Sequence, residues 1–371
     1  MGLPSRATFP AGQYPDLAPP VRPESWLTLL GRGLFGSVSS TALTLLAIAF
    51  LLWTVPGLVQ WAILEADASG QSRQDCTGEG ACWAVITARW RLFLYNFYPD
   101  DQAWRLGLAA LLLPVAVAPL LYDLPRRGLW LAFTAVYPLA AFWLVRGGAG
   151  LEVVSTALWG GLMLTLILGV AGIAASLPIG ILLALGRRSD LPAIRGLSVV
   201  FIETVRGVPL VTILFFASVM LPLFLPEGLN TDKLARAMLV ITVFASAYMA
   251  EVVRGGLQSI PAGQGEAARA LGLSEASVMT FIVLPQALRV SIPGIVNTFI
   301  GLFKDTSLVF FAIGLFEIVG VGESTLTNQD WIGLKTEVYL FVGAVFWIIC
   351  FGMSRLSLSL ERRQGGRRTD P

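Results

Sequence analysis

The chain has 371 residues, of which 55% are hydrophobic and 13% are charged, and its mean hydropathy is +0.72. Soluble domains carry about 25% charged residues, so the composition excludes an ordinary soluble protein. The sequence contains no histidine, which removes the commonest metal ligand and the Ser-His and Cys-His catalytic pairs. We therefore expect no metal site, and the net charge of +2 gives no support for nucleic-acid binding.

Residues 1–35 are polar and proline-rich and predict a tail without regular structure. Long apolar runs follow, several of them near the ~20 residues that cross a ~30 Å hydrocarbon core as a helix. Such runs favour helices over a β-barrel, whose strands alternate with period two. We predict an all-α integral membrane protein with about eight transmembrane helices, at 40–64, 106–122, 129–146, 160–185, 208–225, 236–254, 288–316 and 337–356. Pro293 predicts a kink in the seventh.

Lys and Arg are about twice as numerous on the side that would hold both termini, so the positive-inside rule places both termini in the cytoplasm. Cys76 and Cys82 then lie in an external loop at 65–105, where they form either a disulfide or two free thiols. Cys350 lies in an apolar run and reads as a packed hydrophobe. We expect a cytoplasmic N-terminal tail (1–35), a three-helix extension (36–150) and a basic cytoplasmic tail (359–371).

The stretch "GQGEAARALGLSEASVMTFIVLPQAL" interrupts the apolar runs between the sixth and seventh spans. Residues 264–271 predict a short helix with Glu266 in its first turn, and Gly272 is suited to a left-handed turn after it. Ser274 predicts the N-cap of a second helix that stops before Pro285. On physical grounds alone, the segment is either an inert interfacial linker or a slim helix that enters a groove of another protein.

The same stretch resembles the "EAA" loop of membrane subunits in bacterial ABC importers. That loop has Glu-Ala-Ala, three residues, Gly, nine residues and Ile-x-Leu-Pro, and every spacing is matched here. The resemblance implies that the loop at 263–285 couples this chain to an ATP-binding subunit through Glu266, Ala267, Ala268, Gly272, Ile282, Leu284 and Pro285. It also implies that residues 151–358 form a five-helix type I ABC importer permease core.

Three further stretches, "FIETVRGVPLVTILFF" (201–216), "AYMAEVVRGGLQSIPAGQGEAARALGLS" (247–274) and "FKDTSLV" (303–309), resemble permeases of the polar amino-acid branch. The extra N-terminal spans resemble the long permease subunit of general L-amino-acid transport systems. The resemblance implies a dimeric ATPase that binds ATP and Mg, a homologous second permease forming a heterodimer and a periplasmic amino-acid-binding protein. The resemblance also implies that the chain lies in the bacterial inner membrane, surrounded by lipid, and that its substrates are amino acids. The chain has no P-loop, so no cofactor is expected in it.

Polar residues inside the spans are candidates for the substrate path, because ionisable groups cost ~2.5–3.5 kcal/mol to insert. The candidates are Asn297, Thr298, Asp305, Thr306 and Ser307. The alternative for them is hydrogen bonding between helices. Relatives that import cationic amino acids tend to have a carboxylate at the position of Thr298, so a neutral residue there implies broad or uncharged substrates.

Two further pairs of charged residues have helical spacing. Glu203 with Arg206, and Glu251 with Arg254, are each three residues apart and predict structural ion pairs, with a gate as the alternative. The rival function is an ion-coupled secondary amino-acid transporter, which would need more intramembrane carboxylates than these. A third possibility, an intramembrane enzyme, would need a catalytic pair of side chains, and this sequence contains no clear one. The sequence therefore predicts a non-catalytic permease subunit of an ATP-driven amino-acid importer.

Overall fold

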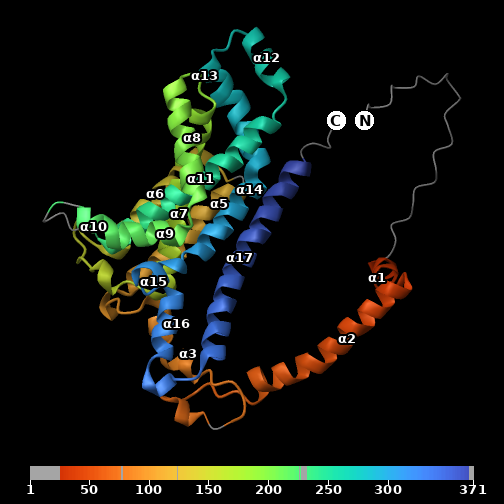
Figure 1. Ribbon diagram of the computed structural model, residues 1–371, viewed down its shortest axis with the longest axis vertical. Coiled ribbons are helices and arrows are strands. Elements are labelled where there is room, and N and C mark those ends of the chain that lie inside the picture. Colours follow the sequence, from red (N-terminus) through yellow and green to blue (C-terminus); the bar gives the residue numbers. More distant parts are fainter. Residues whose placement is uncertain (1–25, 77, 123, 225, 227–231, 367–371) are drawn as a thin grey trace. The chain divides into compact units, whose positions relative to one another are not determined.

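The structure is a computed structural model that describes residues 26–366 apart from 77, 123, 225 and 227–231 (Figure 1). Most of the expected N-terminal tail and the last five residues of the expected basic tail lie outside the described residues. The chain divides into two units: residues 1–66 with 78–81, and residues 67–77 with 82–371. Each unit is described by itself.

The first unit contains α1 (Trp26–Phe35) and α2 (Val38–Val59), which continues as a π-helical turn over Gln60–Leu64. The hydroxyl of Ser37 caps α2 by accepting a hydrogen bond from the backbone N–H of Ser40. The predicted first span is therefore confirmed. The expectation of an irregular tail up to residue 35 is wrong, because "WLTLLGRGLF" forms the amphipathic helix α1.

The second unit is helical, with isolated β-bridges beside the helices in its described parts. Its helices are α3 (Ala84–Ala88), α4 (Trp90–Tyr95), α5 (Trp104–Leu121), α6 (Arg127–Arg146), α7 (Gly161–Arg187), α8 (Pro192–Gly207), α9 (Leu210–Phe215), α10 (Leu221–Phe224), α11 (Lys233–Ser259), α12 (Ala262–Ala270), α13 (Glu275–Ser277), α14 (Leu284–Asp305), α15 (Leu308–Ile313), α16 (Ile318–Leu326) and α17 (Lys335–Gly366). Short 3-10 turns lie at Arg73–Asp75, Asp100–Gln102, Thr156–Leu158 and Gln329–Trp331. π-helical turns lie at Phe216–Met220 and Val278–Val283.

Within the described ranges, seven helical segments are long and apolar enough to cross a membrane, which confirms the all-α membrane fold. They are Val38–Leu64, Asp100–Pro119, Gly128–Arg146, Gly161–Arg187, Lys233–Ser259, Glu275–Asp305 and Lys335–Arg362. An eighth is the pair Pro192–Gly207 and Leu210–Phe224, bent by 101°. The bend lies at Val208, because a residue before proline is kept out of the helical region and Pro209 has no backbone N–H.

The predicted seventh span, 288–316, is wrong at both ends. The membrane-crossing helix runs over Glu275–Asp305 and continues through Pro293. It also continues through Pro285, where the sequence predicted a stop, because a π-helical turn over Val278–Val283 leads into α14. After Asp305 the chain turns and forms the short helix α15.

Glycines let the central helices of the second unit approach closely. A Cβ added to Gly180 of α7 would lie 2.6 Å from Cβ of Met249 on α11, and one added to Gly169 would lie 2.8 Å from the Phe303 ring. On α11, a Cβ at Gly256 would lie 2.6 Å from the carbonyl oxygen of Ala287 on α14. Small residues at such crossings are typical of membrane helices, where close packing drives association.

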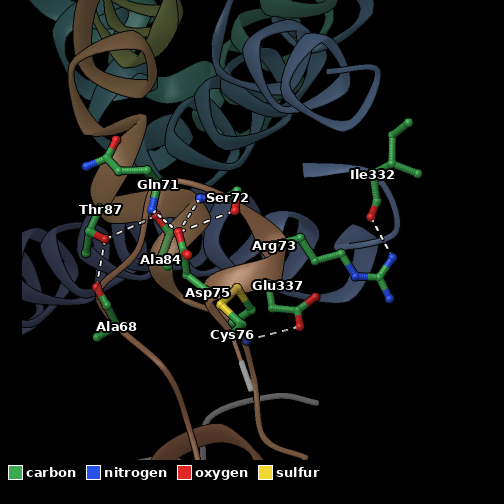
Figure 2. Close-up of a disulfide and its surroundings, with 11 residues drawn as sticks. Ala68, Gln71, Ser72, Arg73, Asp75, Cys76, Ala84, Thr87, Ile332 and Glu337 are labelled. Atoms are coloured by element: carbon green, nitrogen blue, oxygen red, sulfur yellow. Dashed lines mark hydrogen bonds between the residues drawn. A yellow bond between two sulfur atoms is a disulfide. The ribbon is translucent and has the colours of Figure 1, made fainter. Parts of the chain in front are cut away.

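A disulfide loop, defined as residues 67–76 and 82–95, packs against the start of α17 and the chain before it (Figure 2). Cys76 and Cys82 form a disulfide, so the alternative of two free thiols does not apply. The Arg73 guanidinium donates a hydrogen bond to the Ile332 carbonyl at 2.8 Å, and the Cys82 backbone N–H donates to Glu337 at 3.3 Å. The loop therefore belongs structurally to the core helices, which lie far from it in the sequence.

Candidate functional site

The predicted coupling segment lies at one end of the second unit, and α3 and α16 lie at the other end (Figure 1). Its first helix, α12, begins at Ala262, just after Pro261. Glu266 is therefore the fifth residue of the helix, and the expectation that it lies in the first turn is wrong. Proline before the helix sets the start earlier than the charge pattern indicated.

Gly272 ends α12 in the conformation that the sequence predicted. Its φ is +82°, a left-handed value that costs glycine little and strains other residues. The Gly272 N–H donates to the Arg269 carbonyl at 2.8 Å, and the Leu273 N–H donates to the Ala268 carbonyl at 3.3 Å. These bonds satisfy carbonyls that the end of the helix leaves free. Arg269 also forms an ion pair with Glu275 at 2.5 Å across the turn.

Ser274 caps the second helical piece as predicted, and its hydroxyl accepts a hydrogen bond from the Ser277 N–H at 3.3 Å. From Glu275 the helical path runs without interruption into the membrane-crossing part of α14. A displacement of this piece would therefore be transmitted directly to α14. The second helical piece is continuous with α14 because of the π-helical turn, and the spacing of the motif residues does not predict this continuity.

The motif residues differ in exposure. Glu266 and Ala267 are exposed, Ala268 is buried, and Ile282 and Leu284 are half-buried. Sequence reasoning missed the two most exposed large apolar side chains of this segment, Leu271 at 83% and Phe281 at 72%.

A cluster of charged side chains joins α7, α8 and α11 on the coupling-segment side of the unit. Glu251 of α11 lies 2.8 Å from Arg187 of α7, 3.8 Å from Arg206 of α8 and 2.7 Å from Arg254 of its own helix. The Glu251 side chain is 16% exposed. Because the three arginines come from three helices, this carboxylate acts as a shared anchor for all of them.

The predicted i,i+3 pair between Glu203 and Arg206 is replaced by pairs between helices. Glu203 pairs with Arg187 at 2.9 Å, whereas Arg206 faces Glu251 and lies over the Tyr248 ring at 5.4 Å. The Glu251–Arg254 pair does form. Sequence reasoning missed Arg187. This residue follows the predicted fourth span and precedes Arg188, and nothing in that pattern indicates an ion pair with another helix.

The candidate pathway residues on α14 fall on two neighbouring faces. Asn297 and Lys304 are exposed and seven residues apart, which is close to two turns, and Thr298 and Asp305 have the same spacing and are half-buried. The Thr298 hydroxyl donates to the Gly294 carbonyl at 2.9 Å. Asn297 therefore shares a face of α14 with Lys304 more closely than with Asp305.

The two hydroxyl residues after Asp305 serve the end of the helix. Thr306 is fully buried and its hydroxyl donates to the Phe303 carbonyl at 2.7 Å, so in this structure the side chain faces the protein interior. The Ser307 hydroxyl donates to the Lys304 carbonyl at 2.8 Å and the residue is half-buried. Their role in the structure is to satisfy carbonyls at the point where the chain turns.

A second buried carboxylate lies near the opposite end of the unit, and sequence reasoning did not single it out. Glu317 is fully buried and caps α16 by accepting hydrogen bonds from the backbone N–H groups of Val319 at 3.0 Å and Gly320 at 2.9 Å. Thr165 of α7 contacts the same carboxylate at 3.3 Å. Burial raises the pKa of Glu317 from 4.5 to about 7, against the opposing effect of these hydrogen bonds.

Comparisons with known proteins agree with this architecture. A family model described as "Binding-protein-dependent transport system inner membrane component" matches residues 176–366. The inner membrane amino-acid ABC transporter permease protein YhdY of Escherichia coli (strain K12) is 50% identical, and the match covers 95% of this chain and 98% of that protein. The glutamate/glutamine/aspartate/asparagine transport system permease protein BztC of Rhodobacter capsulatus is 40% identical, with coverage of 93% and 95%.

Among solved structures, a crystal structure of an amino acid ABC transporter with histidines matches with a TM-score of 0.49 and 28% identity, covering 55% of this chain and 92% of that chain. The family match includes the charged cluster, the coupling segment and α14 to α17. The relatives match along nearly their whole length. By the family match and these relatives, the chain belongs to the family of binding-protein-dependent transport system inner membrane components, as a multi-pass permease of an amino-acid ABC importer.

Proposed function

We propose that this permease opens an amino-acid pathway into the cytoplasm when a separate ATP-binding subunit moves the segment 262–284. The observation that carries the proposal is the form of this segment: a short helix, a left-handed Gly272 turn and a second piece continuous with α14. Exposed apolar side chains at such an end mark a surface for another protein. Leu271 and Phe281 would then lie in the contact.

The remaining partners follow from the family. A dimeric ATPase would bind ATP and Mg²⁺, a homologous second permease would complete the pore, and an external binding protein would deliver the substrate. Both termini would be cytoplasmic, which agrees with the charge asymmetry of the loops. We propose the boundaries 36–150 for the extension and 151–358 for the core.

For the substrate path we propose Asn297, Thr298, Asp305 and Ser307 on α14. A zwitterionic amino acid needs acceptors for its ammonium group and donors for its carboxylate, and the two polar faces of α14 offer both. The name of BztC specifies acidic amino acids and their amides. With a neutral residue at Thr298, we propose that this permease carries polar amino acids of more than one charge type. Rigid-body motion of the helices would switch access to the path.

The test is reconstitution of the complete importer in proteoliposomes with Gly272→Arg or Glu266→Lys. We expect amino-acid uptake to fall roughly tenfold or more, because each change disturbs a contact surface by about 1.4 kcal/mol or more. Stimulation of ATP hydrolysis by the binding protein should fall with it. The matched control is Glu152→Lys, a charge reversal at an exposed residue outside the segment. Normal uptake in both loop variants would refute the proposed coupling.

A further inference from the structure

The last helix is longer than a membrane requires. α17 has 32 residues and so a length of about 48 Å at 1.5 Å per residue, whereas a hydrocarbon core is ~30 Å thick. With Lys335 at one interface, a point twenty residues later reaches the other interface, close to Arg355. The part of α17 beyond Arg355 therefore lies at the level of the lipid headgroups.

Aromatic side chains lead up to this point on one face of α17. The rings of Trp347 and Phe351 stack with centroids 5.0 Å apart and planes 14° apart, and the side chains are 63% and 49% exposed. The Arg355 guanidinium lies 5.9 Å from the centre of the Phe351 ring. These residues are spaced four apart and follow one face of the helix. The neighbouring Phe346 contacts Phe303 of α14 instead, so that face is turned inward.

The same face continues with polar and cationic residues. Arg355, Ser359 and Arg362, at spacings of four and three, line with Leu358 a hollow of about 320 Å³. Where side chains are described, neither guanidinium takes part in an ion pair. The nearby acid Glu361 accepts a hydrogen bond from Ser357 at 3.0 Å. Two cationic groups therefore border one open hollow at the membrane interface.

We infer that this stripe, from Trp347 to Arg362, binds an anionic phospholipid, with the acyl chain along the two aromatic rings and the headgroup phosphate between Arg355 and Arg362. Guanidinium groups form charge-assisted hydrogen bonds with phosphate oxygens, and the Ser359 hydroxyl adds a donor. Basic residues next to a spanning helix attract anionic lipid. The order of apolar, aromatic and cationic groups along α17 matches the order of the parts of a lipid across one leaflet.

The experiment uses the complete transporter in neutral detergent and a phosphatidylglycerol with a photoactivatable acyl chain. Peptide mass spectrometry should place the cross-links on residues 347–362. In the variant R355Q/R362Q, the probe concentration for half-maximal labelling of this peptide should rise roughly 30-fold, because each arginine near an anionic lipid contributes roughly fivefold.

The matched control is R195Q/R289Q, which removes the same charge from exposed arginines outside the stripe, and its labelling should stay within about twofold. Unlabelled phosphatidylglycerol should compete, whereas phosphatidylcholine and inorganic phosphate should not. Unchanged labelling of the stripe variant, equal competition by phosphatidylcholine or displacement by inorganic phosphate would each overturn the inference. Labelling that occurs only after the partner subunits are removed would also overturn it, because a protein would then cover the stripe.

Discussion

Glu251 holds three helices together, although its sequence spacing predicts only a pair with Arg254. Its single carboxylate faces Arg187, Arg206 and Arg254 from three helices, and the side chain is 16% exposed. Removing one partner of a buried ion pair costs about 3–5 kcal/mol, because the remaining charges are left uncompensated. Here Arg187 would keep only its pair with Glu203, and Arg206 and Arg254 would lose the carboxylate that they face.

We predict that Glu251→Gln destabilises the purified complex by about 2 kcal/mol, below the value for a fully buried pair because water still reaches the cluster. Glu203→Gln is the matched control, since the Glu203 side chain is 54% exposed and should contribute about 1 kcal/mol or less. Denaturant unfolding followed by fluorescence measures both. Equal losses in the two variants would contradict a central role for Glu251.

Glu317 lies at the start of α16, outside the candidate membrane spans, and its protonation is linked to stability. Its folded-state pKa of about 7 exceeds the ordinary value of 4.5, so the folded protein binds an additional proton between these pH values. Its contribution to stability is full below pH 4.5 and is lost as the pH rises through about 7. The protonated form is favoured because burial penalises the charge.

We predict that Glu317→Gln makes the stability of the complex less dependent on pH. Between pH 5 and pH 8, the unaltered protein should lose up to about 3 kcal/mol more than the variant. Glutamine keeps an oxygen that can cap α16, so the fold should persist. Glu152→Gln, at an exposed position, controls for the loss of a carboxylate. Parallel pH profiles of the variant and the unaltered protein would exclude this role for Glu317.

At the scale of elements, the disulfide loop decides how the start of α17 is held. The bridge between Cys76 and Cys82 closes a short loop with a sequence separation of 6. The nearby Arg73 and the bridge residue Cys82 donate hydrogen bonds to Ile332 and Glu337 around the start of α17 (Figure 2). The loop also packs Phe93 edge-on against Phe341, with ring centroids 5.1 Å apart.

We predict that Cys76→Ser with Cys82→Ser destabilises the protein by about 2 kcal/mol, the chain-entropy value for so short a loop. Denaturant unfolding with and without reductant measures it. Cys350→Ser is the control, because this half-buried residue is a free cysteine. Under non-reducing denaturation, a maleimide label should count one thiol in the unaltered protein. Three labelled thiols would show that the bridge does not form.

The coupling segment shows what local sequence can predict at this scale. The Ser274 cap and the Gly272 turn depend on a few neighbouring residues, and both have the predicted form. The predicted stop at Pro285 is wrong because a π-helical turn upstream lets the helix continue. Periodicity does not reveal such a turn, since it inserts only one residue into the helical pattern.

At the scale of the whole molecule, the spanning helices could be predicted because hydrophobicity over about 20 residues is a local property tied to membrane thickness. The predicted fifth span, 208–225, begins at the bend of 101° that separates it from α8, and a π-helical turn over Phe216–Met220 interrupts its α-helix. The candidate pathway was predicted only as a set of residues. Packing buries Thr306 and leaves Asn297 exposed and Asp305 half-buried.

Local sequence patterns were enough to predict the class of the protein and to single out the segment that we propose engages an ATP-binding subunit. Each apolar run and the spacing from Glu266 to Pro285 lie within one stretch of chain, and the charge asymmetry is a count of Lys and Arg over the segments between the runs. Two contacts come from the packing of the whole fold: Arg187 shares Glu251 with Arg206, and the disulfide loop packs at the start of α17. These contacts join residues 64 and 255 positions apart. They depend on how helices pack, which no local pattern encodes.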